Sequence, residues 1–554
     1  MNTTDKKSAQ QLIDILWQKG MQHVVISPGS RNAPMILGFT SHPKYQCYSV
    51  PDERSAGFIA LGIADETKSP VALVCSSGTA LLNYYPAIAE AFYRKIPLVV
   101  LSADRPAYLI DQGDGQTIRQ NNVYANHILY SSVLDETDAD RKNGTIINKA
   151  LNLANSVSGP VHLNVPFEEP IYNIESFKGG LSQVTPLPEP PFNLSHTEIA
   201  EYVSLWNNAS RILILVGQQD IDTRISEMLH HLGAHALILS ETTSNLDIEN
   251  SVKNIDRLII PFSADEQKEF QPDLLISFGG NVVSKKIKGY LRSFRPTHHI
   301  HVENTENAPD TYQCLTHHAK IPVLPFFNQI IDKLDSQSSE WTKKWLNLDS
   351  KRNRHQKSFV DNAPFSDIKV MQTVRNLIPE NSILHLANST PVRYAQLFNW
   401  GKNLTFKSNR GTSGIDGIVS TAIGNAMVTS KLVFLVVGDI SFFYDTNAWW
   451  HRHIPSNFRV IVVNNAGGGI FRFIDGPNTT GQLENFFETH QKNSVKHIAL
   501  GFNVDYFCAT NLEEFNEQFL ILSKSDSAGI LEVFTPQTEN AGILKGYFNN
   551  LVDS

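Results

Sequence analysis

Short apolar runs alternate with amphipathic stretches along the first third of the chain. Apolar side chains recur at helical spacing in residues 9–19, 55–64 and 80–93. The short, mostly apolar runs between these stretches are residues 23–27, 45–50, 71–75, 97–101 and 161–165. Strands that alternate with helices in this way predict a doubly wound parallel sheet.

The same alternation continues through the rest of the chain. Residues 211–216 and 273–278 are candidates for buried strands, and no GxGxxG nucleotide fingerprint accompanies them. Further strand-like runs are residues 383–387, 432–437, 459–463 and 530–534, in the rhythm of the first third. We therefore expect an α/β protein with three doubly wound parallel-sheet domains, of which the outer two are similar.

Two stretches interrupt this alternation. Pro186, Pro188, Pro190 and Pro191 cannot sustain a helix or a central strand, which is typical of a linker. Residues 335–364 are polar and rich in Lys, Ser and Asn. We predict domains at residues 1–185, 186–350 and 351–554.

Composition narrows the classes of function. The chain has 554 residues, 41% hydrophobic and 18% charged, with a net charge of −8 and no basic run. These values favour small-molecule substrates and argue against nucleic acid or a membrane as a partner. The polar N-terminus lacks a secretory core, and no apolar run approaches the ~20 residues that span a bilayer, so we expect a cytoplasmic protein.

Two strand-like runs in the last third end in residues that can bind a cation through oxygen. One run ends in Gly438 and Asp439, and the other leads to Asn465. The intervening stretch has room for one helix and one strand, so both side chains are expected at one edge of a parallel sheet. Asp439, the Asn465 amide and a backbone carbonyl near Gly467 suit magnesium, and Gly438 lets a diphosphate approach the backbone. The alternative is that these are ordinary turn residues.

Four arginines point to anionic substrates. Arg31, Arg105, Arg393 and Arg410 all lie in segments that contain Gly, Ser or Pro and follow predicted strands. Guanidinium groups pair bidentately with carboxylates, so the set predicts carboxylate-rich substrates. The alternative is that the four arginines form surface or interdomain salt bridges.

Seven motifs carry a resemblance to a known family. They are residues 26–32 (ISPGSRN), 76–80 (SSGTA), 102–106 (SADRP), 115–120 (GQTIRQ), 388–393 (NSTPVR), 409–417 (NRGTSGIDG) and 467–471 (GGGIF). With them, essentially the whole chain resembles the thiamine-diphosphate-dependent enzymes, and among these the carboligase family of menaquinone biosynthesis. The resemblance implies thiamine diphosphate and Mg²⁺ (or Mn²⁺) as cofactors.

The resemblance also implies which residues hold the cofactors. The metal ligands would be Asp439, Asn465 and Gly467. The cofactor-binding residues would be Glu53, Ser77, Gly78, Thr79, Asn83, Ile415, Gly438, Asp439, Ile440, Ser441 and Asn465. Ile415 would support the bent cofactor, although an isoleucine among small residues is also typical of a core.

Glu53 has a chemical reason to be in this set. The aminopyrimidine of the cofactor must shift to its imino form, and a carboxyl group beside the pyrimidine nitrogen promotes that shift by acid–base exchange. Glu53 follows a predicted strand and heads the helix predicted at residues 55–64. The alternative is a carboxylate favoured at a helix start by the macrodipole.

The substrate contacts implied by the resemblance come from all three domains. They are Ser30, Arg31, Asn32, Arg105, Gln116, Lys285, Ser389, Arg393, Arg410, Ile470 and Phe471. Lys285 and Lys286 are alternatives for one contact, and a solvated helix start is an equal interpretation of both. The catalytic group would be Glu53, Gln116, Ser389 and Arg393.

The reaction implied is decarboxylation of 2-oxoglutarate and conjugate addition of the succinyl-semialdehyde unit to isochorismate, in a homodimer or dimer of dimers whose site lies between two chains. Two alternatives stay open. Another thiamine-diphosphate-dependent decarboxylase or carboligase would share the cofactor residues but not the arginine set. A non-catalytic binding module would be expected to lose Glu53, Asp439 or Asn465.

Overall fold

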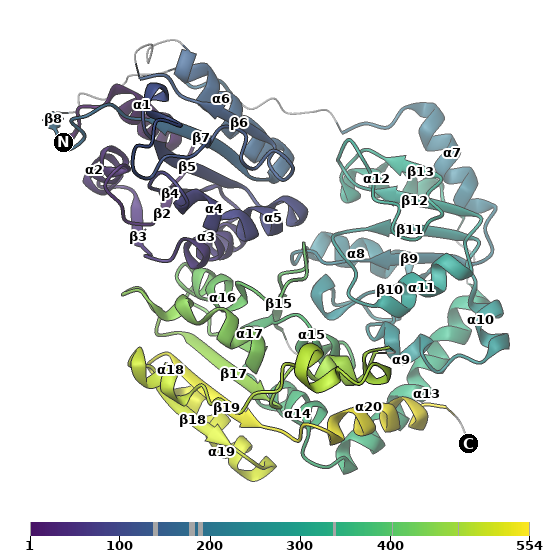
Figure 1. The fold of residues 1–554 in the computed structure, drawn as a ribbon. Helices are drawn as coiled ribbons and strands as arrows, with labels where there is room; N and C mark the ends of the chain where they lie inside the picture. The colour runs from purple at the N-terminus through teal and green to yellow at the C-terminus, as the bar shows by residue number, and fades with distance from the viewer. Residues whose placement is uncertain are drawn as a thin grey trace.

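The computed structural model describes residues 2–136, 142–176, 183–186, 192–335, 339–401, 403–474 and 476–552. Within these residues the chain forms three parallel sheets flanked by helices, coloured purple to blue, teal, and green to yellow in Figure 1. A short antiparallel pair, β1 (Asn2–Thr4) with β8 (Ile174–Ser176), lies apart from them. The three sheets confirm the predicted α/β fold class.

The first sheet has the strand order β3-β2-β4-β5-β7-β6. Its strands are β2 (His23–Ile26), β3 (Gln46–Ser49), β4 (Val71–Cys75), β5 (Leu98–Asp104), β6 (Tyr130–Val133) and β7 (Val161–Pro166). Its helices are α1 (Lys7–Gln18), α2 (Ala33–Ser41), α3 (Glu53–Thr67), α4 (Ala80–Asn83), α5 (Tyr85–Arg94) and α6 (Gly144–Leu153).

The middle sheet has the order β10-β9-β11-β12-β13. Its strands are β9 (Ile212–Val216), β10 (Leu237–Leu239), β11 (Leu274–Phe278), β12 (His298–Val302) and β13 (His317–Ala319). The helices of this part are α7 (His196–Asn207), α8 (Thr223–Leu232), α9 (Ile255–Ile259), α10 (Ala264–Phe270), α11 (Lys285–Ser293), α12 (Val323–Ile330) and α13 (Glu340–Asn362).

The third sheet has the order β15-β14-β16-β17-β19-β18. Its strands are β14 (Ile383–Leu386), β15 (Thr405–Lys407), β16 (Val433–Gly438), β17 (Phe458–Asn464), β18 (Asp505–Ala509) and β19 (Gly529–Phe534). Its helices are α14 (Asp367–Leu377), α15 (Thr390–Ala395), α16 (Ile418–Ala426), α17 (Asp439–Tyr444), α18 (Lys496–Gly501), α19 (Leu512–Lys524) and α20 (Glu539–Asn550).

The first and third sheets share one topology. In both, the first strand in the chain takes the second position, and the next strand lies beside it at the edge of the sheet. The third and fourth strands follow on the other side of the first strand. The last strand lies between the fourth strand and the fifth, which forms the other edge. The likeness predicted from the rhythm of apolar runs is therefore confirmed at the level of strand order. In sheets of this kind, ligands bind at the carboxyl ends of the central strands, so candidate site residues are expected there in both sheets.

The predicted elements needed several corrections. The strands β6, β10, β12, β13, β15 and β18 were not predicted, because they are short or carry polar residues. The helix predicted at residues 80–93 is two helices, α4 and α5, which meet at Tyr84 shortly before Pro86. No helix in the described ranges combines the length and the apolar composition that a bilayer crossing requires.

The predicted domain boundaries stay predictions. The boundary at residue 185 lies beside Pro186, whereas Pro188, Pro190 and Pro191 of the predicted linker lie outside the described residues. The boundary at residue 350 falls inside α13, a helix that also contacts α9 and α20. This helix spans the middle and third parts of the chain.

Helices α3 and α16 join the first and third sheets with their backbones in close contact. A Cβ atom at Gly62 of α3 would lie 2.0 Å from the carbonyl oxygen of Thr421. A Cβ atom at Gly424 of α16 would lie 2.1 Å from the carbonyl oxygen of Ile59. The apolar side chains around this helix pair form one continuous core that reaches both sheets. The two outer domains are therefore packed as one body around α3 and α16.

Candidate active site

Asp439 and Asn465 lie at the carboxyl ends of two neighbouring strands of the third sheet. β16 and β17 pair in parallel, with Gly438 opposite Val463. Asp439 follows β16 as the first residue of α17, and Asn465 follows β17. Both side chains are buried. The structure thus brings the two predicted cation ligands to one sheet edge, while their role as ligands stays a prediction.

Hydrogen bonds orient both side chains. Asp439 accepts the N–H of Ile440 at 2.9 Å and the side-chain amide of Gln491 at 2.5 Å. Burial raises the pKa of Asp439 to about 6, although these hydrogen bonds oppose the rise. Asn465 donates its Nδ2 to Asp367 Oδ2 at 2.9 Å, and no hydrogen bond within the described ranges engages its Oδ1. The Asn465 oxygen is therefore the atom left to bind a cation.

Left-handed backbone occurs at or near several candidate residues, and Ala466 adjoins Asn465. Left-handed φ angles occur at Gln116 (56°), Ser389 (74°), Ser413 (61°) and Ala466 (64°). A non-glycine residue in such a conformation costs about 1–3 kcal/mol and is typical of a functional site. At Gly467 the φ angle is 150°, and a Cβ there would lie 2.8 Å from the carbonyl oxygen of Glu488, so only glycine fits.

Glu53 begins α3 at the carboxyl-end side of the first sheet. The Asp52 side chain accepts the N–H of Ser55 at 3.2 Å and caps the helix, which sets where α3 starts. Burial, and then the charge of Asp52, raise the pKa of the half-buried Glu53. Burial is the main cause of the raised pKa of Cys75 and of Tyr84, and the charge of Glu53 adds to both, so its carboxyl group lies near the end of β4.

The predicted pyrimidine-pocket residues follow β4 directly. Ser77 and Gly78 are buried, whereas Thr79 and Asn83 are exposed. Gly78, with φ of 79°, donates its N–H to Gln120 Oε1 at 2.9 Å. The buried Ser77 hydroxyl has no hydrogen-bond partner among the described residues. A buried polar atom without a partner is unfavourable, so this pocket suits a ligand with a polar atom.

Two of the four predicted carboxylate-binding arginines are already paired. Arg31 lies 2.9 Å from Glu169 Oε1, and Arg105 lies 3.0 Å from Asp114 Oδ2. These ion pairs match the salt-bridge alternative, at least in this state of the chain. For Arg31 and Arg105 a substrate would have to compete with a neighbouring carboxylate.

The other two arginines form no direct ion pair among the described residues. Arg393 donates to the carbonyl oxygen of Ser389, and Arg410 donates to Asn388 Oδ1 at 2.6 Å. Within the described part of the chain, neither forms an ion pair with a carboxylate. Burial lowers the pKa of both groups, and the charge of Arg393 lowers that of Arg410 further, so the two lie close together. Adjacent guanidinium groups favour an anionic ligand, although the charges of Asp256 and Glu241 offset part of their positive charge.

Two acids of the middle domain, the buried Glu241 and the half-buried Asp256, lie near these arginines, and sequence reasoning missed both. Glu241 accepts the N–H groups of Val283 at 2.6 Å and Ser284 at 2.7 Å. Asp256 in α9 accepts the hydroxyl of Ser284. Burial raises the pKa of Glu241 to about 7 and also raises that of Asp256. The position of Glu241 just after a strand was a usable signal, but β10 itself had not been predicted.

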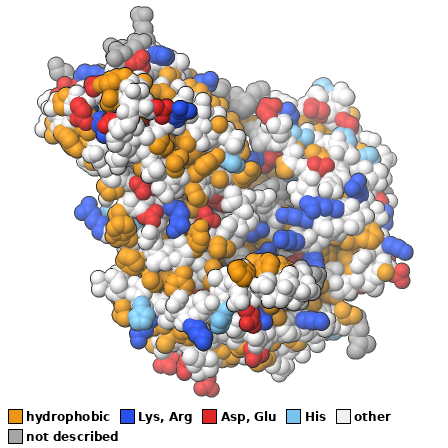
Figure 2. Space-filling view, in the orientation of Figure 1, with side chains coloured by type: hydrophobic (Ala, Val, Ile, Leu, Met, Phe, Trp, Pro, Cys, Tyr) orange, Lys and Arg blue, Asp and Glu red, His pale blue; other side chains and the backbone are white. Residues whose placement is uncertain are grey.

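Lysines at the start of α11 face the same region. Ser284 caps this helix, and Lys285 and Lys286 are exposed in its first turn. Lys288, one turn further, is half-buried, and its pKa is lowered by burial and further by the charge of Arg410. Figure 2 shows Lys and Arg side chains gathered at the hollow near β10, α11 and α15. The choice between Lys285 and Lys286 stays open, and Lys288 is a third lysine near Arg410.

The exposure of the predicted site residues is mixed. Exposed or half-buried are Ser30, Glu53, Thr79, Asn83, Arg105, Gln116, Lys285, Ser389, Arg393, Ile415, Gly438, Ile440, Ile470 and Phe471. Buried are Arg31, Asn32, Ser77, Gly78, Arg410, Asp439, Ser441, Asn465 and Gly467. The alternative of Ile415 as a core residue is wrong, because its side chain is 36% exposed. Its carbonyl oxygen accepts the Ser441 hydroxyl at 2.6 Å, which ties its turn to α17.

The candidate residues form two groups within this chain. One group follows strands β2 to β5 of the first sheet, and the other follows strands β14 to β17 of the third, while Lys285 lies in the middle domain. No hydrogen bond or ion pair in the described ranges joins Glu53 to Asp439 or Asn465. Instead, the start of α3 contacts the far end of α17, where Arg54 donates to the carbonyl oxygen of Tyr444 at 2.7 Å.

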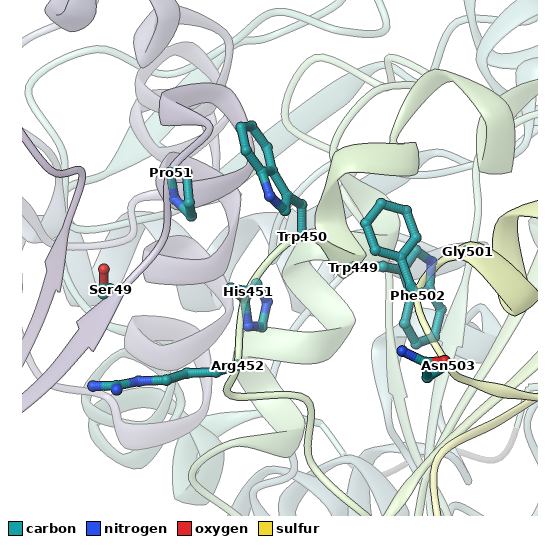
Figure 3. A pocket seen from close by; sticks show the side chains of 9 residues that line it. All are labelled: Ser49, Pro51, Trp449, Trp450, His451, Arg452, Gly501, Phe502 and Asn503. Carbon is teal, nitrogen blue, oxygen red and sulfur yellow. The ribbon is translucent and has the colours of Figure 1, made fainter.

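A separate cavity of about 590 Å³ lies where the first and third domains meet (Figure 3). Ser49 and Pro51 line it from the first domain, and Trp450, His451 and Arg452 from the third. It contains none of the predicted site residues. The predicted site is therefore distinct from this cavity.

The donor set at the third sheet fits a magnesium-bound diphosphate. Asp439 and Asn465 supply oxygen atoms, which hard divalent cations prefer. A Cβ at Gly438 would meet nothing within 4 Å, so open space adjoins the backbone there. The pyrimidine part of the cofactor needs a polar partner, and the buried Ser77 hydroxyl, which has no hydrogen-bond partner among the described residues, can supply one. The residues present thus fit thiamine diphosphate.

Comparison with known proteins gives the same family. Residues 6–123 match the family described as thiamine pyrophosphate enzyme, N-terminal TPP binding domain, and residues 198–386 match the middle domain of thiamine pyrophosphate enzymes. A 2-succinyl-5-enolpyruvyl-6-hydroxy-3-cyclohexene-1-carboxylate synthase of Flavobacterium johnsoniae is 44% identical over 98% of both chains. Synthases of the same name from Porphyromonas gingivalis (98% of this chain, 97% of the relative) and Bacteroides fragilis (99% of both) are 38% and 36% identical. The chain therefore belongs to the 2-succinyl-5-enolpyruvyl-6-hydroxy-3-cyclohexene-1-carboxylate synthase family of thiamine-diphosphate-dependent enzymes.

Proposed function

We propose that this chain decarboxylates 2-oxoglutarate and adds the succinyl-semialdehyde unit to isochorismate, giving 2-succinyl-5-enolpyruvyl-6-hydroxy-3-cyclohexene-1-carboxylate in menaquinone biosynthesis. The observation that carries the substrate assignment is the pair Arg393 and Arg410, two neighbouring guanidinium groups without an ion-pair partner in the described ranges. Both substrates carry two carboxylates, which is the chemistry that such a pair recognises.

The cofactor residues divide between the two outer domains. Thiamine diphosphate, when bound, supplies an acidic thiazolium carbon and an electron sink for decarboxylation. Asp439, the Asn465 oxygen and a backbone carbonyl at Gly467 hold Mg²⁺ (or Mn²⁺). Burial raises the pKa of Glu53, which favours the protonated carboxyl group, and Glu53 serves as the acid beside the aminopyrimidine.

The substrate residues orient carboxylates and exclude water. Arg393 and Arg410 take the carboxylates on the third-domain side, with Ser389 and Gln116 held toward the reacting atoms by their left-handed backbone. Further contacts come from Ser30, Arg31, Asn32, Arg105, Lys285, Ile470 and Phe471. Loss of water from this pocket favours addition to a carbon acceptor over protonation.

The active form is a homodimer or a dimer of dimers. Large apolar side chains beside the candidate residues are exposed in the single chain; they include Leu82, Tyr93, Ile415, Tyr444 and Trp450. The separation of the two residue groups within one chain also supports completion of the site by a second copy. Light scattering across a dilution series tests this, and a fully active monomer would contradict it.

Product analysis by mass spectrometry tests the reaction. The protein is supplied with thiamine diphosphate, Mg²⁺ and 2-oxoglutarate, with and without isochorismate. We expect a succinyl-bearing adduct only when isochorismate is present. Succinic semialdehyde as the sole product in both reactions would instead mean a simple decarboxylase.

A further inference from the structure

Asp367 is a buried carboxylate directly behind the predicted metal ligand Asn465. It is the first residue of α14, and its side chain is 4% exposed. Its Oδ2 accepts from Asn465 Nδ2 at 2.9 Å, and its Oδ1 accepts from Thr535 Oγ1 at 2.6 Å and from Asn540 Nδ2 at 2.9 Å. Within the described residues its partners are neutral, and no Lys or Arg pairs with it.

This arrangement decides which way the Asn465 amide faces. The oxygen and nitrogen of an asparagine amide are nearly the same size, so packing alone does not choose between the two orientations. Both carboxylate oxygens of Asp367 accept hydrogen bonds in the structure, and an accepting oxygen requires that Nδ2 of Asn465 faces it. The amide oxygen is then directed away from Asp367, as a cation requires.

We propose that Asp367 is a positioning residue that orients the Asn465 amide so that its oxygen, not its nitrogen, faces the divalent cation. The proposal rests on the proposed function, in which Asp439 and Asn465 hold that cation. Residues behind a metal ligand commonly fix its orientation, and their loss weakens metal binding by about 10–100-fold. Nothing in the local sequence reveals this role, because Asp367 and Asn465 are 98 positions apart in the chain.

A purely structural role is the rival explanation. Asp367 donates its own N–H to Asn540 Oδ1 at 2.9 Å, so it also joins the start of α14 to α20. Burial raises the pKa of Asp367, and three side-chain hydrogen bonds oppose that rise. A structural carboxylate would affect folding stability but not the cation requirement of a folded variant. The experiment must therefore measure the cation requirement itself.

The test measures the Mg²⁺ concentration that gives half-maximal thiamine diphosphate binding, by calorimetry or tryptophan fluorescence on the full chain. In Asp367→Asn, position 367 can donate as well as accept, so the Asn465 amide is free to turn over. We expect the half-saturating Mg²⁺ concentration to rise about 10–100-fold. Thr535→Val is the matched control: it removes a hydrogen bond to the other oxygen, and we expect a change of less than about threefold.

A side-chain exchange provides the rescue. In the double variant Asp367→Asn, Asn465→Asp, position 465 carries a carboxylate, which presents an oxygen to the cation in either orientation. We expect the half-saturating Mg²⁺ concentration to fall at least about tenfold relative to Asp367→Asn. If Asp367→Asn and the double variant both fold and require the same Mg²⁺ concentration as the wild type, the positioning role is overturned. The role is also overturned if the double variant requires as much Mg²⁺ as Asp367→Asn does. If Asp367→Asn does not fold, the folded double variant decides: tight Mg²⁺ binding supports the role, and loss of binding overturns it.

Asp439→Ala separates this inference from the proposed function. We expect it to abolish Mg²⁺-dependent cofactor binding, because it removes a direct ligand. If Asp439→Ala leaves the Mg²⁺ requirement unchanged, the assignment of the cation site itself is wrong. If Asp439→Ala abolishes binding and Asp367→Asn matches the wild type, only the positioning role is wrong.

Discussion

Glu90 accepts hydrogen bonds from Thr412, at 2.7 Å from its N–H and 2.8 Å from its hydroxyl. The second carboxylate oxygen of Glu90 accepts the N–H of Gly411 at 2.8 Å. Glu90 is a buried residue of α5, in the first domain, and Thr412 follows Arg410 in the third. A helix of one domain therefore holds the loop that presents an arginine in another.

Glu90→Ala should loosen that loop and move Arg410. We expect KM for the carboxylate substrates to rise about tenfold, since a lost charge-assisted hydrogen-bond set is worth about 1.5–3 kcal/mol. Glu90→Gln keeps one accepting oxygen and should have a smaller effect. Steady-state kinetics with 2-oxoglutarate and isochorismate varied separately checks this. Unchanged KM values in Glu90→Ala would mean that the loop keeps its shape without Glu90.

Arg410→Ala should weaken substrate binding more strongly than the loss of a surface arginine does. Arg410 is buried and has no ion-pair partner in the described ranges, so it is available to a substrate carboxylate. We expect kcat/KM to fall about 10²-fold, with Arg410→Lys intermediate because an ammonium group cannot pair bidentately. Arg224→Ala is the control, since Arg224 is exposed and pairs locally with Asp222. Equal kinetics for the two alanine variants would remove Arg410 from the site.

Glu53→Gln should abolish most of the activity while leaving the fold intact. The amide cannot exchange a proton with the aminopyrimidine, so we expect the rate to fall about 10²–10⁴-fold. Asp52→Asn is the matched control: an asparagine can still cap α3 through the N–H of Ser55, so this change should alter stability and activity little. Single-turnover decarboxylation, measured on cofactor-saturated protein, distinguishes the two. Wild-type turnover in Glu53→Gln would contradict the acid assignment.

Gly424→Ala should destabilise the contact between α3 and α16. The new Cβ would lie 2.1 Å from the carbonyl oxygen of Ile59, so one helix must shift. We expect the free energy of unfolding to fall by about 3 kcal/mol. Gly542→Ala in α20 meets nothing within 4 Å and should be neutral or stabilising by up to about 1 kcal/mol. Urea unfolding of both variants gives the comparison. Equal midpoints would show that α3 and α16 can move apart without a loss of stability.

Asp445 should make stability depend on pH. Burial raises its pKa to about 7, although the N–H and hydroxyl of Ser420 oppose the rise. Between about pH 4, where an unfolded aspartate ionises, and about pH 7, the folded chain binds more protons than the unfolded chain. The contribution of Asp445 to stability is therefore present at low pH and lost as pH rises through 7.

Asp445→Asn removes that dependence. We expect the wild type to lose more free energy of unfolding than the variant between about pH 5 and pH 8, measured by urea unfolding at each pH. Glu241, whose pKa is also raised to about 7, contributes equally to both proteins and cancels in the comparison. Parallel pH profiles for wild type and variant would show that Asp445 is ionised in the folded chain.

Apolar periodicity predicted the central strands well and the edge strands poorly. β4, β9, β11 and β17 are buried on both faces, so their sequences are almost entirely apolar, with Ser277 in β11 and Arg459 and Asn464 in β17 as the exceptions. β12 was missed because it contains three histidines, two of which share the hydroxyl of Ser277 at 2.7 and 2.9 Å. That partner lies on the neighbouring strand, so local pattern could not show that these polar residues are buried.

The amino-acid sequence by itself determined the α/β class and the likeness of the outer domains, because strand periodicity is a local property. It also predicted Glu53, Asp439 and Asn465 as candidate site residues, because they lie at strand ends. Only the tertiary structure decided that Asp367 lies behind Asn465, that Glu90 holds the Arg410 loop, and that Glu241 and Asp256 lie near the arginines. These contacts join residues far apart in the chain. A hydrogen bond or a Coulomb interaction depends on distance in space, which no local pattern records.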